Sequence, residues 1–147
     1  MRKELIEAQI VLGRDDVKRE LKDSIRRNAW KRIFLVAGNS FFKLPIGRDF
    51  AEIEEEMGIT VEKFSGFSVN PKLEEAIEGS RAFKAFSGDV IIAVGGGSAM
   101  DTGKCIKLFS AVPEETLFQV PWQDNGVPFV AIPTTAGSGS ESTPFAV

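Results

Sequence analysis

Short continuous apolar runs alternate along the chain with segments in which apolar residues recur every three or four positions. An unbroken apolar run of four to six residues is typical of a strand that is covered on both faces. After a first short strand at residues 9–12, the sequence predicts four further strands, at residues 33–37, 60–64, 90–94 and 129–132. The segments of helical spacing predict four helices, at about residues 15–28, 49–57, 71–86 and 98–110.

This alternation of strands and helices predicts crossover units, in which parallel strands lie side by side and helices cover the sheet. The expected fold class is therefore α/β, with a Rossmann-like, mostly parallel sheet and flanking helices in three layers. A chain of 147 residues fits one domain, so residues 1–147 are interpreted as a single unit. Ligands bind such sheets beyond the carboxyl ends of the strands.

Local signals predict where the helices begin and end. Asp15 or Asp16 is expected to cap the first helix, and Gly58 is expected to stop the second. Pro71 has a favourable first-turn position for the third. Three apolar residues spaced four apart predict a buried face on the first helix: Val17, Leu21 and Ile25.

Composition removes several function classes. Hydrophobic residues make up 43% of the chain and charged residues 27%, as in globular proteins. The net charge of −3 gives no general attraction to nucleic acid or anionic membranes, and no apolar run approaches the roughly 20 residues that span a bilayer. The single cysteine excludes an intramolecular disulfide, and no secretion signal opens the chain, so the cytoplasm is the expected compartment.

Histidine and tyrosine are both absent from the sequence. The chain therefore has no histidine triad, no histidine metal ligand and no tyrosine acid, and one cysteine cannot build a thiolate zinc site. The acidic run from Glu52 to Glu56 fits the solvated face of a helix better than a metal site. We expect no catalytic residue and no metal ligand here, and interpret the chain as one that acts by binding.

Three consecutive glycines separate the strand at 90–94 from the next helix. Glycine lets the backbone approach a bulky ligand and tolerates positive φ, and the helix that follows directs its unpaired N–H groups into the same gap. Gly96, Gly97 and Ser98 are therefore candidates to hold a pyrophosphate, although a glycine run also fits a tight turn. Asp101 is expected in the first turn of the helix, either as a stabiliser of its N-terminus or as an acceptor for a ligand.

Two more loops follow strands at the same predicted edge. Thr134, Thr135 and Ser138 offer hydroxyls to a ligand, and their alternative role is a self-capped turn. A turn at 38–40, Gly-Asn-Ser, follows the strand at 33–37. Polar, glycine-rich loops at the ends of neighbouring strands indicate a nucleotide site.

Two strings carry a resemblance to a known family. Residues 95–104 read Gly-Gly-Gly-Ser-Ala-Met-Asp-Thr-Gly-Lys, and residues 132–141 read Ile-Pro-Thr-Thr-Ala-Gly-Ser-Gly-Ser-Glu. Together with Asn70-Pro71, they resemble the iron-containing (group III) alcohol dehydrogenases. Glycerol dehydrogenases and dehydroquinate synthases share the fold, but the second string fits them less well.

The resemblance implies a role for each candidate in binding a nicotinamide dinucleotide. The triple-glycine loop would hold the pyrophosphate, and Asp101 would lie on the nicotinamide side. Thr134, Thr135 and Ser138 would contact the adenine and ribose portion. Asn70 would help line the cleft.

The turn at the end of the strand at 33–37 bears on the choice of cofactor. Family members that prefer NAD commonly carry an acidic residue there, whereas this chain has Gly38, Asn39 and Ser40. A carboxylate would repel a 2′-phosphate, and the amide and hydroxyl here can donate to one. We therefore expect NADP to be preferred over NAD.

The resemblance covers only the front part of such an enzyme. The family holds its metal with one Asp and three His, supplied mainly by a second, helical domain that this chain lacks. Iron or zinc is thus expected only in a full-length parent, which would transfer hydride between a small alcohol or aldehyde and the cofactor. The chain alone is expected to bind dinucleotide weakly, to be inactive and to self-associate through exposed apolar surface.

Two other functions stay open. One is a stand-alone, non-catalytic nucleotide-binding or assembly module. The other is a synthase or phosphate-eliminating relative on the same scaffold, whose phosphorylated substrate would require basic residues that these loops mostly lack.

Overall fold

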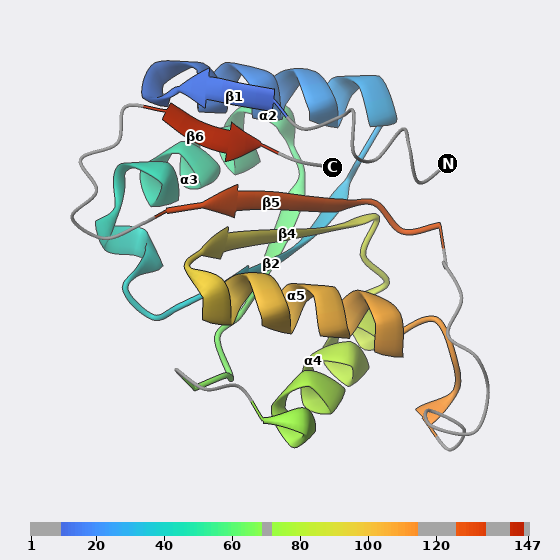
Figure 1. Ribbon diagram of the computed structural model, residues 1–147. Coiled ribbons are helices and arrows are strands. Elements are labelled where there is room, and N and C mark those ends of the chain that lie inside the picture. The colour runs from blue at the N-terminus through green and yellow to red at the C-terminus, as the bar shows by residue number, and fades with distance from the viewer. Residues whose placement is uncertain (1–9, 69–71, 115–125, 135–141, 146–147) are drawn as a thin grey trace.

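The computed structural model describes residues 10–68, 72–114, 126–134 and 142–145. Its main sheet has four parallel strands in the order β3-β2-β4-β5 (Figure 1). Their bounds are Arg32–Ala37 for β2, Thr60–Phe64 for β3, Val90–Gly95 for β4 and Phe129–Pro133 for β5. The predicted α/β class with a mostly parallel, Rossmann-like sheet is confirmed.

Helices cover both faces of this sheet, so the unit has three layers. Helices α2 and α3 lie on one side, and α4 and α5 lie on the other (Figure 1). The bounds are Arg14–Asn28 for α2, Pro45–Met57 for α3, Leu73–Phe86 for α4 and Gly97–Phe109 for α5, and a short 3₁₀ turn, η1, spans Phe41–Lys43. No helix in the part of the chain that the structure describes is long and apolar enough to cross a membrane.

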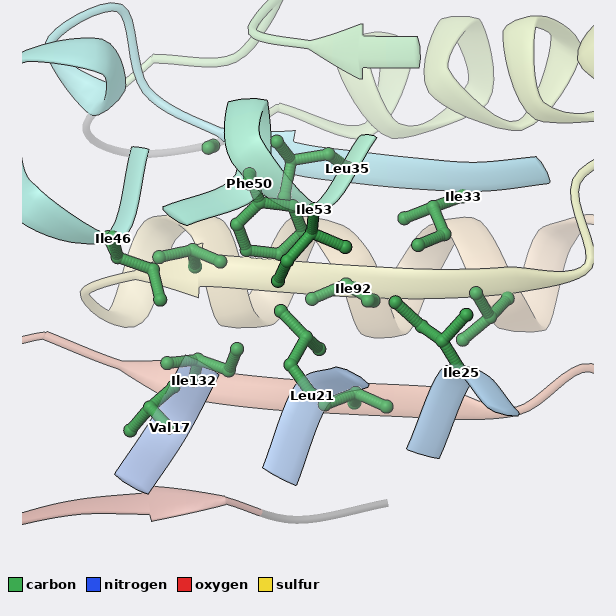
Figure 2. Close-up of a cluster of buried hydrophobic side chains, with 14 of the residues drawn as sticks. Val17, Leu21, Ile25, Ile33, Leu35, Ile46, Phe50, Ile53, Ile92 and Ile132 are labelled. Carbon is green, nitrogen blue, oxygen red and sulfur yellow. The ribbon is translucent and has the colours of Figure 1, made fainter. Parts of the chain in front are cut away.

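The core beneath α2 and α3 is mostly aliphatic, with three buried aromatic side chains, Trp30, Phe41 and Phe50. Leu21 of α2 is fully buried against the sheet, and the predicted four-residue spacing of its face is confirmed. Figure 2 shows how the side chains from α2, α3 and three strands meet. The labelled ones are Val17, Leu21, Ile25, Ile33, Leu35, Ile46, Phe50, Ile53, Ile92 and Ile132. Each buried side chain of this size contributes about 1.5–3 kcal/mol to folding.

The core on the opposite face is richer in aromatic rings, which pack with aliphatic side chains and with glycine. Phe34 of β2 packs edge-on against Phe83 of α4, with ring centroids 5.5 Å apart. A Cβ at Gly103 of α5 would lie 2.8 Å from the Phe129 ring and 3.1 Å from the Cβ of Ala93. Since such distances are shorter than van der Waals contact, only glycine lets α5 lie this close to β4 and β5.

A second, two-stranded sheet lies beside β5 (Figure 1). Strand β1, Ile10–Gly13, pairs antiparallel with β6, Ser142–Phe145. The first strand was predicted, but β6 was not. Its pairing joins opposite ends of the described chain, and a four-residue segment carries no local signal of such a partner.

All four predicted helix starts differ from the structure, that of α5 by one residue, since α5 begins at Gly97 instead of Ser98. Helix α2 begins at Arg14, which places Asp15 and Asp16 inside the first turn instead of at the cap. Helix α3 begins at Pro45, one turn before residue 49, because proline has no N–H to leave unpaired at a first helical position. Helix α4 begins at Leu73, beyond Pro71, and Glu75 accepts the backbone N–H of residue 72 at 2.9 Å.

Polar side chains close the amino edge of the main sheet, where its strands begin. The carboxylate of Asp89 accepts the backbone N–H groups of Lys31 and Arg32 at 2.7 and 2.9 Å. The Nε of Arg32 donates to the backbone carbonyl of Phe86 at 2.8 Å. The Arg32 guanidinium also lies 4.3 Å from the centre of the Phe86 ring. At this edge, side chains thus form hydrogen bonds with backbone N–H and carbonyl groups near the strand ends.

Candidate functional site

The candidate site lies at the carboxyl edge, where the four parallel strands end. In-register pairing sets Ala37 of β2 beside Val94 of β4, and Gly95 beside Pro133 of β5. The amide of Thr134 donates to the carbonyl of Gly95 at 2.8 Å, which holds the start of the β5 loop next to the β4 loop. The structure therefore brings the beginnings of three predicted loops to one edge.

Gly95 has the conformation that makes glycine necessary in the β4–α5 loop. Its φ is +141°, a region that L side chains rarely adopt, and a Cβ there would lie 3.2 Å from that of Ala99. Sequence reasoning named the next three residues as ligand contacts and passed over this one. The signal was its place as the first of three glycines directly after a buried strand.

Gly96 and Gly97 border open space. Among the described residues, a Cβ added at either position would meet nothing within 4 Å. Gly96 is the N-cap of α5 and offers no side chain to cap it, while Met100 donates the first helical hydrogen bond to its carbonyl at 3.1 Å. The first-turn amides of α5 therefore point toward this space with the positive end of the helix dipole.

This arrangement fits a diphosphate. Anions bind at helix N-termini because the backbone N–H groups and the dipole both favour negative charge. Side chains at residues 96 and 97 would fill the space that such a group needs. Ser98 adds a hydroxyl in the first turn of α5.

The β2 loop supplies a second polar segment at this edge. Gly38, Asn39 and Ser40 form a turn between β2 and η1, and the last two are exposed. The Phe41 amide donates to the carbonyl of Gly38 at 3.1 Å. Ser65, which sequence reasoning missed, donates its hydroxyl to the carbonyl of Ala37 at 2.7 Å. This bond joins residues 28 apart, and no local pattern signals it.

Asp101 is not in the first turn of α5, contrary to the prediction. Because the helix begins at Gly97 and not at Ser98, Asp101 is its fifth residue, and its side chain is exposed. The helix dipole acts mainly within the first turn, so a role as an N-terminal stabiliser loses its support. Burial, with a smaller contribution from Asp101, raises the pKa of the Cys105 thiol, which packs beside Phe109.

Three candidates lie outside the described residues: Asn70, Thr135 and Ser138. Thr134 is described and half-buried at the end of β5. The site that can be built from the structure thus comprises the β2 turn, the β4–α5 loop and the first residue after β5.

The described residues do not form a metal site. The sequence contains no histidine, and the described residues include no group of three or more His, Cys, Asp or Glu side chains placed to hold an ion.

Comparisons with known proteins agree with the geometry. A family model for iron-containing alcohol dehydrogenase matches residues 8–147. The chain is 37% identical over 99 residues to an NADPH-dependent butanol dehydrogenase of Clostridium saccharobutylicum, a match that covers 63% of this chain and 26% of that enzyme. It is 34% identical over 123 residues to a choline dehydrogenase of Bacillus subtilis, covering 79% of this chain and 30% of that enzyme.

A solved structure shows the same fold. The iron-containing alcohol dehydrogenase of Thermotoga maritima is 26% identical to the chain with a TM-score of 0.65, and the match covers 84% of this chain and 35% of that one. The chain therefore spans between about a quarter and about a third of the length of these three relatives.

Proposed function

The chain belongs to the iron-containing alcohol dehydrogenase family, and from this membership we propose that it is the NADP-binding part of an oxidoreductase that transfers hydride between an alcohol and a nicotinamide cofactor. The observation that carries the proposal is the N-terminus of α5. It combines a glycine cap, open space at two successive glycines and a position beyond the end of a parallel strand.

The residues of this chain would bind and orient the cofactor. Backbone N–H groups at the start of α5 and the Ser98 hydroxyl would hold the pyrophosphate. We further assign Thr134, with Thr135 and Ser138, to the adenine and ribose portion, and Asn70 to the wall of the cleft. Asp101 lies on the exposed side of α5 and would face the nicotinamide side. The bound nicotinamide would supply the hydride acceptor or donor.

The preference for NADP rests on the turn after β2. No carboxylate occurs among Gly38, Asn39 and Ser40. A carboxylate about 4 Å from a 2′-phosphate would repel each of its charges by about 1–4 kcal/mol, and that repulsion is missing here. The butanol dehydrogenase relative is named as NADPH-dependent, which is in keeping with this choice.

Hydride transfer by the isolated chain is not expected. Metal activation can lower the pKa of a bound hydroxyl to about 7, which is on the order of 12 kcal/mol of help toward the alkoxide. No side chain in the described site can replace that contribution. The activity therefore belongs to a longer protein that supplies the metal ligands.

Calorimetric titration of the purified chain with NADP and with NAD tests the proposal. We expect weak binding of both, with NADP tighter. At least tenfold tighter binding of NAD would overturn the preference, and no binding of either would overturn the binding function. Metal-dependent alcohol oxidation by the 147-residue chain would contradict the expected inactivity.

A further inference from the structure

We propose that Ser65 is a positioning residue that fixes the Gly38–Ser40 turn for recognition of the 2′-phosphate end of the cofactor. The inference rests on the proposed function and adds a residue that contacts no ligand itself. It begins from the hydroxyl of Ser65, which donates to the carbonyl of Ala37 at 2.7 Å.

This hydrogen bond extends the β2–β3 pairing past its last registered pair. That pair is Val36 with Phe64. Ala37, the last residue of β2, and Ser65, the first residue after β3, come next along the two segments. Ala37 is also the last residue before the turn. The Ser65 side chain therefore fixes the point from which the turn departs.

The far end of the turn is anchored independently. Phe41 is 2% exposed, and its ring lies 5.6 Å from that of Phe50 in α3. The turn thus runs between a buried ring at one end and the Ser65 hydrogen bond at the other. Between them, Asn39 and Ser40 are exposed, so these two anchors set where their donors lie.

Ser65 is itself held by its own loop. Its carbonyl accepts the amide of Phe67 at 2.9 Å. The amide and hydroxyl of Ser68 donate to the carboxylate of Glu75 at 3.2 and 3.1 Å, which ties the loop to the first turn of α4. Because these hydrogen bonds hold the loop that carries Ser65, the Ser65 hydroxyl can fix the position of the β2 turn.

The test compares Ser65→Ala with Ser65→Thr, which keeps the hydroxyl. The matched control is Ser110→Ala, because the Ser110 hydroxyl also donates to a backbone carbonyl, that of Lys107 at 2.9 Å, at the far end of α5. Titration calorimetry of the whole chain would measure NADP and NAD affinity for each variant. Amide hydrogen exchange at Phe41 would report the turn without ligand.

We expect Ser65→Ala to weaken NADP binding by about 3- to 10-fold, the effect of one lost hydrogen bond, and NAD binding by less than about 2-fold. Ser65→Thr should restore NADP affinity, Ser65→Ala should speed exchange at Phe41, and Ser110→Ala should change neither. Equal losses for both cofactors, or no loss, would overturn the role of Ser65 alone. If the unaltered chain binds neither cofactor, the proposed function fails and the role of Ser65 in recognition fails with it.

Discussion

At the amino edge of the main sheet, a side chain accepts backbone N–H groups where strand β2 begins, whereas at the carboxyl edge helix α5 begins at glycines that offer no capping side chain. Asp89 accepts two backbone N–H groups at the first edge. Gly96 caps α5 at the second with no side chain to offer. The same sheet thus ends in a closed edge and an open one.

The missing N-cap side chain at the start of α5 lowers the stability of the carboxyl edge. A serine or aspartate in place of Gly96 at the N-cap of α5 would stabilise the helix by about a few tenths of a kcal/mol. Such a side chain would also occupy the amides and the space that a diphosphate needs. The open edge is therefore less stable by itself, and a bound anion would supply the missing contacts.

The largest expected effect is that of Gly95→Ala. Because φ at this residue is +141° and the new Cβ would crowd Ala99, we expect the free energy of unfolding to fall by about 1–3 kcal/mol. Urea denaturation measures this loss. Gly97→Ala is the control, since its Cβ meets nothing within 4 Å, and equal destabilisation by both would contradict a special role for Gly95.

Next comes Gly97→Val, which should separate binding from stability. The side chain enters the open space at the start of α5, so we expect NADP affinity to fall at least about tenfold, or about 1.4 kcal/mol. The urea midpoint should stay close to that of Gly97→Ala. Undiminished affinity in the calorimeter would show that the cofactor does not use this space.

Asp89→Ala tests the closed edge. Removing the acceptor of two amides should lower the free energy of unfolding by about 1 kcal/mol and leave NADP affinity unchanged, because the change lies at the opposite edge of the sheet. Urea denaturation and calorimetry measure the two quantities. If Asp89→Ala weakened NADP binding as much as Gly97→Val, the amino edge would also contribute to binding, which would contradict the proposed difference between the two edges.

The smallest effect concerns the loop after β3, where the carboxylate of Glu75 accepts the backbone amides of Ser68 and Lys72. The backbone amides of Lys72, first, and Ser68 hold the pKa of Glu75 below its usual value of 4.5. The stabilisation is therefore present above that value and is lost as the pH falls through the lower pKa of the folded state.

The difference in urea midpoint between the unaltered chain and Glu75→Gln should accordingly shrink between about pH 6 and pH 3. Glu74→Gln, on the neighbouring residue, should show no such change. A midpoint difference that grows on acidification would reverse the assignment.

Sequence patterns predicted the parallel sheet well because β2, β4 and β5 are largely continuous apolar runs, and the shorter β3 alternates with helical segments in the same order. Val90–Gly95 and Thr60–Phe64 were both found within one residue of their observed ends. Helix starts were less predictable, because α3 follows a Leu44 N-cap that forms no side-chain capping bond. A shift of one residue at the start of α5 was enough to move Asp101 out of the first turn.

The supporting side chains of the site could not be predicted. Ser65 reaches Ala37 and Asp89 reaches Lys31 across separations of 28 and 58 residues. Such contacts depend on how elements pack, which local spacing does not encode. The β4–α5 loop could be predicted because three successive glycines after a buried strand indicate a turn at the carboxyl edge of the sheet.

Gly103 lies in the second turn of α5 and well inside the helix, yet it bears on how deeply a ligand can sit. By letting the helix rest on Phe129 and Ala93, it fixes the height of the α5 N-terminus above the strand ends. A larger residue there would tilt helix α5 away from the main sheet and would raise the N-terminus of the helix, where we propose that the anion binds. Mutational scans of this fold should therefore find binding defects at a buried position that no ligand touches.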